Sequence, residues 1–236
     1  RIGEEKVRLR GISYGPFRPN TAGAPFPENN RLTSDLEHLS ALQFDTIRLY
    51  DPPSDHLLKE AQRLSLRLIV GIPWTDHVDF LRDPTLQAKI ITTVRDIATR
   101  LRDHSCVVAF LVGNEIEKTL VRWMRPQRVQ QFLEQLIAAG RECAPNQLFS
   151  YATYPSTEYL IPRNADFLAV NVYLEQPGAF QSYLQRLQNL AGNQPLLITE
   201  FGLDAAAHGE AAQAETQQWF EDICARSAVA GTVWFS

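Results

Sequence analysis

The sequence predicts a (β/α)8 barrel, and three observations lead to this prediction. Eight short runs of β-branched, aromatic and other apolar residues recur along the chain. Longer segments with helical spacing separate most of these runs, an alternation that is typical of parallel sheets built from βα units. The length of 236 residues also suits one α/β barrel, so we expect a single domain over residues 1–236.

The expected strands follow one another at fairly regular intervals. They cover residues 8–15, 44–51, 66–74, 106–115, 148–155, 166–173, 195–202 and 231–236. An open doubly wound sheet is the alternative arrangement of such units. It would need a G-x-G-x-x-G phosphate turn after the first strand, and "GISYGPF" lacks that spacing, so the barrel is preferred.

Six segments between these strands have apolar residues at a period near 3.6 and predict helices. The second of them begins behind Ser54, which we expect to be its N-cap. The segment after the fifth strand is short, and its structure is ambiguous. The marking residues are Leu36, Leu39 and Leu42; Leu57, Leu58, Ala61 and Leu64; Ile90, Ile91, Val94, Ile97 and Leu101; Phe132, Leu133, Leu136 and Ile137; Phe180, Tyr183, Leu184 and Leu187; and Trp219, Phe220 and Ile223 within residues 210–227.

The eighth strand stops where the chain stops, at Ser236. We therefore expect the barrel to lack its eighth helix, which would leave a gap in the helical layer over the seam between the eighth and first strands. Alternation from Trp234 predicts that Val233 and Phe235 point outward and leave an apolar strip bare. Together with the start at Arg1, this suggests a piece of a longer polypeptide that continues with a helix.

Composition excludes several classes of protein. The net charge is −4 and the basic residues are scattered, which disfavours a nucleic-acid partner. No apolar run approaches the roughly 18 residues of a membrane span. The histidines lack metal-site spacing, and none of the lysines that we considered as Schiff-base nucleophiles ends a strand, so we expect neither a metal nor an organic cofactor. The three cysteines form no CxxC motif; they are Cys106, Cys143 and Cys224.

Two carboxylates end otherwise uncharged strands. Glu115 closes "VVAFLVGNE" on the fourth strand, and Glu200 closes "PLLITE" on the seventh. In a barrel, reactive residues lie at the carboxyl ends of the strands, where a charge is far cheaper than inside. Two carboxyl groups about 5 Å apart are what a retaining glycosidase needs, one as nucleophile and the other as acid/base.

Donors near the same strand ends suggest how the two roles are divided. Arg48 ends the second strand and Tyr173 ends the sixth, and both are placed to keep Glu200 ionised. Asn114 precedes Glu115 and is a candidate donor to a sugar hydroxyl beside the reacting carbon. Glu200 is then the expected nucleophile, and Glu115 the expected acid/base.

Aromatic residues at strand ends are candidates for sugar contacts. Trp234 is the preferred platform for a sugar ring, and Trp74 after the third strand is a second candidate. Tyr14 at the end of the first strand could supply a hydroxyl to the cleft or pack in the core. Trp123 could serve as a contact or as packing, whereas Trp219 has helical spacing and is expected in the core.

The motifs "ISYG", "IRLYD", "VGIPW", "VGNE" and "VNVY" resemble those of retaining glycoside hydrolases of clan A, most closely family 17. The resemblance implies a (β/α)8 barrel that cleaves or rearranges β-1,3-glucans, with Glu115 as acid/base and Glu200 as nucleophile. The sequence "EFG" at Glu200 is closer to families 2 and 5 than to the eukaryotic family 17 pattern. Similar barrels occur as domains of bacterial membrane-bound glucan synthases, which implies an extracytoplasmic location.

We therefore expect a retaining β-glycosidase or glucanosyltransferase that acts on a β-linked oligo- or polysaccharide, with β-1,3-glucan favoured. One alternative is a family 2 or 5 type of enzyme that acts on another β-linked polysaccharide. A second alternative is a carbohydrate-binding barrel without catalysis, which could lose either glutamate and still stack sugars.

Overall fold

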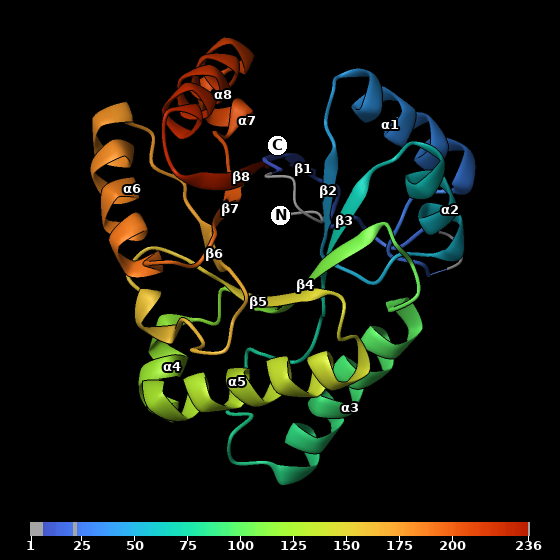
Figure 1. Cartoon of the computed structure of the whole chain (residues 1–236), viewed down its shortest axis with the longest axis vertical. Helices are drawn as coiled ribbons and strands as arrows, with labels where there is room; N and C mark the ends of the chain where they lie inside the picture. Colours follow the sequence, from blue (N-terminus) through green and yellow to red (C-terminus); the bar gives the residue numbers. More distant parts are fainter. Residues whose placement is uncertain (1–6, 21–22, 236) are drawn as a thin grey trace.

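In the computed structural model, which describes residues 7–20 and 23–235, eight parallel strands form a closed barrel in the order β1 to β8 (Figure 1). The predicted (β/α)8 architecture is confirmed. The strands are β1 (Leu9–Ser13), β2 (Thr46–Leu49), β3 (Arg67–Gly71), β4 (Val107–Asn114), β5 (Leu148–Thr153), β6 (Leu168–Asn171), β7 (Leu196–Phe201) and β8 (Val229–Trp234).

Helices lie outside the barrel and connect successive strands. They are α1 (Asn29–Ala41), α2 (Asp55–Arg63), α3 (Pro84–Leu101), α4 (Lys118–Met124), α5 (Pro126–Cys143), α6 (Pro177–Ala191), α7 (Ala205–His208) and α8 (Glu210–Ala225). The ambiguous segment after β5 contains one turn of 3-10 helix, η1 (Glu158–Leu160). Ser54 caps α2 as predicted, because its side chain accepts a hydrogen bond from the backbone N–H of Leu57.

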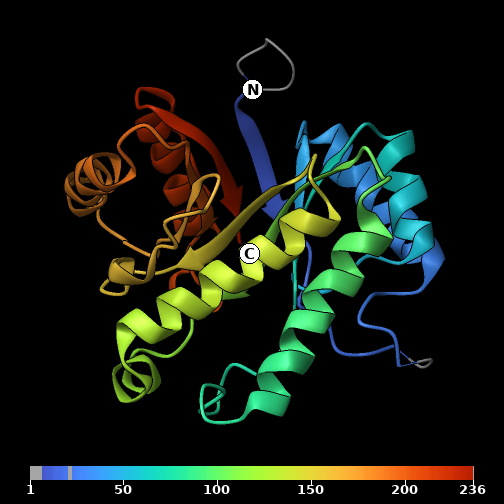
Figure 2. The same cartoon turned by 60° about the horizontal axis from the view of Figure 1, so that its bottom comes forward.

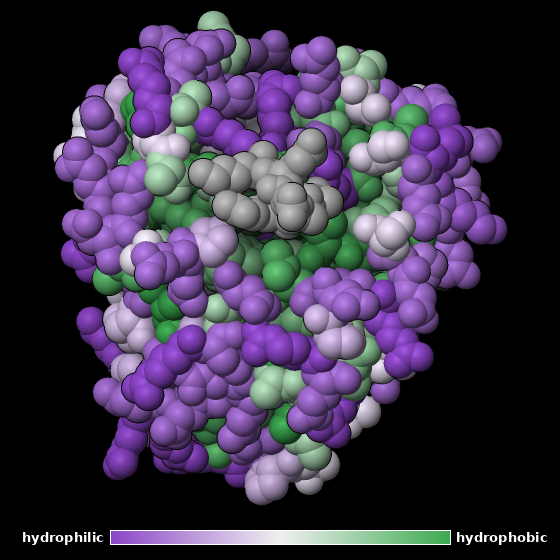
Figure 3. Space-filling model, viewed as in Figure 1, coloured by the Kyte–Doolittle hydropathy of each residue, from purple (hydrophilic) through white to green (hydrophobic). Residues whose placement is uncertain are grey.

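Apolar side chains fill both the inside of the barrel and the space under the helices. Small and branched residues of several strands, such as Ala109 of β4, Leu197 of β7 and Val233 of β8, form a cluster inside the barrel. A larger outer cluster lies beneath α1 to α5, and another beneath α6 and α8. Helices α3 and α5 pack side by side over β4 and β5 (Figure 2). Hydrophilic residues cover the rim of the helical ring, and apolar residues gather toward its middle (Figure 3).

The seam between β8 and β1 differs from the prediction. The described chain ends just after β8 without a further helix, but Val233 is fully buried inside the barrel. The outward residues of β8 are Thr232 and Trp234, and both are buried. The predicted bare strip of Val233 and Phe235 is therefore wrong. The prediction failed because it assigned the wrong face to each residue: Trp234 points outward, and its two neighbours point inward.

Arg10 of β1 spans part of this seam. It donates to the carbonyl of Leu42 at the end of α1, at 2.7 Å, and its Nε lies 3.6 Å from the carboxylate of Glu221 on α8. Its guanidinium also covers the ring of Phe44, at 4.6 Å from the ring centre. A long basic side chain thus shields apolar surface between the first and last helices with its aliphatic stem.

Candidate active site

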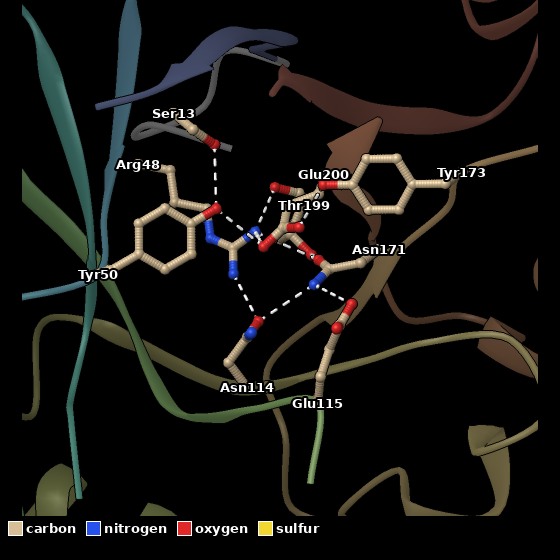
Figure 4. A network of polar contacts seen from close by, with 9 residues as sticks. All are labelled: Ser13, Arg48, Tyr50, Asn114, Glu115, Asn171, Tyr173, Thr199 and Glu200. Atoms are coloured by element: carbon tan, nitrogen blue, oxygen red, sulfur yellow. Dashed lines mark hydrogen bonds and ion pairs between the residues drawn. The ribbon is translucent and has the colours of Figure 1, made fainter. Parts of the chain in front are cut away.

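Four strands deliver polar side chains to one point at the carboxyl end of the barrel (Figure 4). Arg48 lies on β2, Asn114 ends β4, Asn171 ends β6 and Glu200 lies near the end of β7. Ladder register is irregular near the ends of β4, β6 and β7. There, an advance of three residues along β4 matches two along β5, one along β6 matches two along β7, and three along β7 match two along β8. Such irregularities re-aim side chains, and here they occur on the three strands whose ends carry the amides and carboxylates.

Glu200 is almost fully buried and surrounded by donors. Its Oε1 lies 2.6 Å from Nη1 of Arg48 and accepts a hydrogen bond of 2.8 Å from the phenol of Tyr50. The phenol of Tyr173 donates to Oε2 at 2.5 Å. One cation and two hydroxyl donors therefore converge on this carboxylate.

Arg48 is itself fixed by several acceptors besides Glu200. It is 1% exposed, donates to the backbone carbonyl of Thr199 at 2.6 Å and to Oδ1 of Asn114 at 2.7 Å, and reaches Oδ1 of Asn171 at 3.2 Å. Its guanidinium also lies against the ring of Tyr50, at 4.7 Å from the ring centre. A planar group with five donors suits this position, because it ties the ends of β4, β6 and β7 together.

Glu115 has a contrasting environment. It accepts one hydrogen bond, of 2.8 Å, from Nδ2 of Asn171. Burial raises the pKa of Glu115, and the negative charge of Glu200 adds to the increase, while the amide of Asn171 and the charge of Arg48 oppose it. Glu115 also has a positive φ of 48°, a strained conformation for a residue other than glycine. The two carboxyl groups therefore differ in their partners: Glu200 has a cation and two phenols, whereas Glu115 has one amide donor.

A pocket of about 180 Å3 adjoins this network. It is lined by Arg48, Tyr50, Trp74, Asp76 and Asn114 together with backbone of β3 and β4. Trp74 is fixed by a 2.6 Å hydrogen bond from its indole N–H to the carbonyl of Val112. Burial raises the pKa of Asp76. The pocket offers an aromatic edge, an amide and a carboxylate to a small polar ligand.

The structure brings most of the predicted site residues together. Glu115, Glu200, Arg48, Asn114 and Tyr173 belong to one hydrogen-bonded network. Trp74 lies in the adjoining pocket. The predicted separation of about 5 Å between the two carboxyl groups stays a prediction, as do the catalytic roles.

Two predicted residues lie elsewhere. Trp234 points away from the barrel interior and packs on Phe201, with ring centres 5.0 Å apart, in the cluster beneath α6 and α8. Tyr14 is buried and donates to Asp35 of α1 at 2.8 Å. Both lie one position out of phase with the residues that face the site. Trp234 is therefore not placed for the sugar contact that we expected, and Tyr14 has the packing role that was its alternative.

Residues that the sequence did not single out occupy the positions that face the site. Ser13 precedes Tyr14, and its hydroxyl lies 3.3 Å from that of Tyr50. Phe235 follows Trp234, and its ring meets those of Tyr50 and Tyr173 edge-on. Tyr50 and Asn171 were also missed, although period-two alternation from Arg48 and Tyr173 would have placed both on the site face.

The part of the chain that the structure describes contains no group of three or more His, Cys, Asp or Glu residues that could hold a metal ion. The chemistry that this site can perform with its own side chains is proton transfer by one carboxyl group and nucleophilic attack by another.

Glu115 predicts a specific pH dependence. A folded-state pKa raised by burial means that folding favours the protonated carboxyl group, so this stability contribution is lost as pH rises through that pKa. Glu115→Gln should therefore increase the free energy of unfolding relative to the wild type above the raised pKa, but much less below the pKa of an ordinary Glu. Denaturant unfolding of both proteins across pH measures this difference. An advantage that grows as pH falls would contradict the assignment.

Replacing Arg48 tests the buried ion pair. Arg48→Met should lower the free energy of unfolding by about 3–5 kcal/mol, because the carboxylate of Glu200 would stay buried without its cation. The matched control is Arg63→Met, which removes the surface ion pairs with Glu37 of α1 and Glu60 of α2 and should change stability far less. If both variants lost the same free energy of unfolding, the buried ion pair would contribute no more to stability than the exposed ones.

Comparison with known families gives one match by sequence. Residues 124–236 match the family model described as glycosyl hydrolase catalytic core. This segment includes β5 to β8 and Glu200, but not Glu115. No curated protein matches the chain by sequence.

Many solved structures share the fold. A β-glucuronidase of Bacteroides uniformis superposes with a TM-score of 0.82 at 16% identity, over 98% of this chain and 30% of its own. A β-glucuronidase of Ruminococcus gnavus in complex with D-glucuronic acid gives 0.80 at 18%, over 97% and 42%. A β-glucuronidase of Bifidobacterium dentium complexed with coumarin-3-O-glucuronide gives 0.78 at 15%, over 97% and 40%. The chain thus spans less than half the length of these proteins.

These comparisons agree with the prediction of a glycoside hydrolase barrel. The family match supports that class directly, and the structural likeness, at such low identity, shows the shared fold. Neither comparison identifies family 17 or a β-glucan substrate.

Proposed function

We propose that this chain is the catalytic domain of a retaining β-glycosidase or glucanosyltransferase that acts on a β-linked glucan, with β-1,3 linkages favoured. Glu200 attacks the anomeric carbon and forms a glycosyl-enzyme. Glu115 protonates the departing oxygen and then activates the incoming water or sugar hydroxyl. The observation that carries the proposal is the contrast between Glu200, which is held by Arg48 and two phenols, and Glu115, whose pKa burial raises.

The donors around Glu200 support both halves of this reaction. The guanidinium of Arg48 pairs with the carboxylate before attack and stabilises it again as a leaving group when the intermediate breaks down. Asn114 and Asn171 are held by the same guanidinium, so their amides are orientated before substrate arrives. Preorganised donors of this kind lower the barrier without reorganising during the reaction.

A glucuronide is the alternative substrate, because the structural neighbours named above are β-glucuronidases. Asp76 favours a neutral sugar instead. Among the described residues that line the pocket, Arg48 is the one cation, and it already pairs with Glu200. A uronic acid carboxylate beside Asp76 would meet a like charge without a free cation, whereas sugar hydroxyls can donate to that carboxylate.

The test is a product-resolved assay on β-1,3-, β-1,4-, β-1,6- and β-1,2-linked glucans, with aryl β-glucoside and aryl β-glucuronide in parallel. We expect cleavage or transfer on a glucan. We also expect a higher kcat/KM for the aryl glucoside than for the aryl glucuronide, and a smaller ratio between the two in Asp76→Asn. Turnover of the glucuronide alone would overturn the glucan proposal. Sugar binding without any turnover would favour the non-catalytic barrel.

The setting of this domain is part of the proposal. The resemblance to barrels fused to membrane-bound glucan synthases supports a role in trimming, branching or transferring a growing glucan outside the cytoplasm. Across the described ranges 7–20 and 23–235, no helix is long and apolar enough to cross a membrane. Fractionation of the cells that make the protein, with detection of this domain, tests the location.

A further inference from the structure

An exposed tryptophan at the rim of the barrel takes no part in the site described above. Trp123 lies at the end of α4 and is 66% exposed. Tryptophan is usually well buried, and an indole ring left in water forfeits the burial of a large apolar surface. Packing within this chain therefore gives little reason for a tryptophan at this position.

The ring is nevertheless held in a defined orientation. Its indole N–H donates to Asp79 at 3.1 Å, and Arg82 binds the same carboxylate oxygen at 3.1 Å. The guanidinium of Arg82 also lies 5.4 Å from the centre of the indole ring. A surface ring that is fixed before ligand arrives loses little conformational entropy on binding.

The surroundings form a pocket of about 320 Å3, within the range of small-molecule sites. Besides Trp123, its lining includes Arg82, Arg125 and Arg128. Arg125 joins α4 to α5 with a strained φ of 72°, and Arg128 of α5 donates to the carbonyl of Leu81 at 3.4 Å. Each of these guanidinium groups carries five N–H donors, more than these contacts use.

This pocket is tied to the candidate active site by two short segments. Helix α4 begins three residues after Glu115 and rises by about 10 Å over its seven residues. The loop after β3 carries Trp74 beside the catalytic pocket and, a few residues later, Asp79 beside Trp123. Phe80 packs edge-on against Trp74, with ring centres 5.0 Å apart, so the two ends of this loop are rigidly connected.

We propose that Trp123 and its arginine-lined pocket form a distal subsite for a glucan chain, several sugar units from the scissile bond. The indole face stacks on the apolar C–H face of a pyranose, and guanidinium N–H groups donate to its hydroxyls. The inference rests on the proposed function, since a long chain must extend from Glu115 and Glu200 to reach this pocket. A substrate with one sugar unit cannot span that distance.

The experiment compares Trp123→Ala, Trp123→Tyr and the wild type on one aryl β-glucoside and on β-1,3-glucan oligosaccharides of increasing length. We expect Trp123→Ala to raise KM roughly tenfold for long oligosaccharides and to leave kcat/KM for the aryl glucoside unchanged, with Trp123→Tyr close to the wild type. The matched control is Leu190→Ala, which truncates an exposed apolar residue on a different helix, α6. It should leave the kinetics on both kinds of substrate unchanged.

Equal kinetics of Trp123→Ala and the wild type at every chain length would overturn the subsite. An equal loss on the aryl glucoside would also overturn it, because that pattern indicates a structural role. Calorimetric titration of the long oligosaccharide into the same proteins separates this inference from the proposed function. If the wild type binds the oligosaccharide but turns over nothing, the proposed function fails, and weaker binding by Trp123→Ala still supports the subsite.

Discussion

Glu200→Gln is expected to lower kcat by roughly 10⁴-fold or more on every substrate, whatever its leaving group. The amide has nearly the same shape as the carboxylate but cannot attack the anomeric carbon. It also places a neutral group against Arg48, so the free energy of unfolding should be measured alongside the kinetics. The measurement is initial rates on the preferred glucan and on an activated aryl glycoside.

A matched control for this variant is Glu158→Gln. Glu158 is also a buried glutamate and accepts a hydrogen bond from a tyrosine, Tyr183, but it lies in η1 and is not one of the residues of the site network. Its replacement should leave kcat within a few-fold of the wild type. If Glu200→Gln kept near-normal rates on either substrate, Glu200 would not be the nucleophile.

Glu115→Ala is expected to separate substrates by leaving group. On a glucan, whose departing oxygen must be protonated, the rate should fall by roughly 10²–10⁴-fold. On an activated aryl glycoside the first step needs little acid assistance, so the glycosyl-enzyme should form readily and break down slowly. Added azide should then accelerate turnover and give a β-glycosyl azide, because the small anion needs no general base.

The same comparison can fail in an informative way. Equal losses on the glucan and on the activated substrate, without rescue by azide, would remove the assignment of Glu115 as acid/base. Glu117→Ala is the control, because Glu117 lies two residues further along the chain and caps α4 through Thr119 and Leu120. It should show neither the leaving-group dependence nor the rescue.

Strand order and the two carboxylates could be predicted because both depend on local patterns. Most β-rich runs are followed by a segment whose apolar residues recur with helical spacing. Glu115 and Glu200 each place a charge at the end of an uncharged run. Arg48 and Tyr173 followed from their positions at strand ends. The structure places all four in or beside one network, as the barrel topology requires.

It was harder to predict which residues of each strand point into the barrel and which point toward the helices. In a parallel barrel both faces of a strand are buried, so an apolar run carries little information about which residues point inward. Trp234 and Phe235 are both aromatic, and either fits the inner or the outer layer. The structure shows that the ring of Phe235 meets those of Tyr50 and Tyr173, whereas Trp234 lies with Phe201 beneath the helices.

Contacts between residues far apart in the sequence could not be predicted from local patterns. The link from Asn171 to Glu115 joins residues 56 positions apart, and the link from Tyr50 to Glu200 joins residues 150 positions apart. Helix α4 has seven residues, too few for a periodic signal, so the exposed position of Trp123 could not be inferred.

Trapping the glycosyl-enzyme and locating the bound sugar would test directly whether Glu200 is the nucleophile of a retaining mechanism. The protein would be incubated with an activated 2-deoxy-2-fluoro-β-glucoside, and the labelled peptide would be sequenced by mass spectrometry. The fluorine slows both steps, whereas the activated leaving group speeds only formation of the intermediate, which therefore accumulates. The account predicts one sugar attached through an ester to Glu200. Labelling of another residue, or turnover with inversion and no covalent adduct, would contradict it.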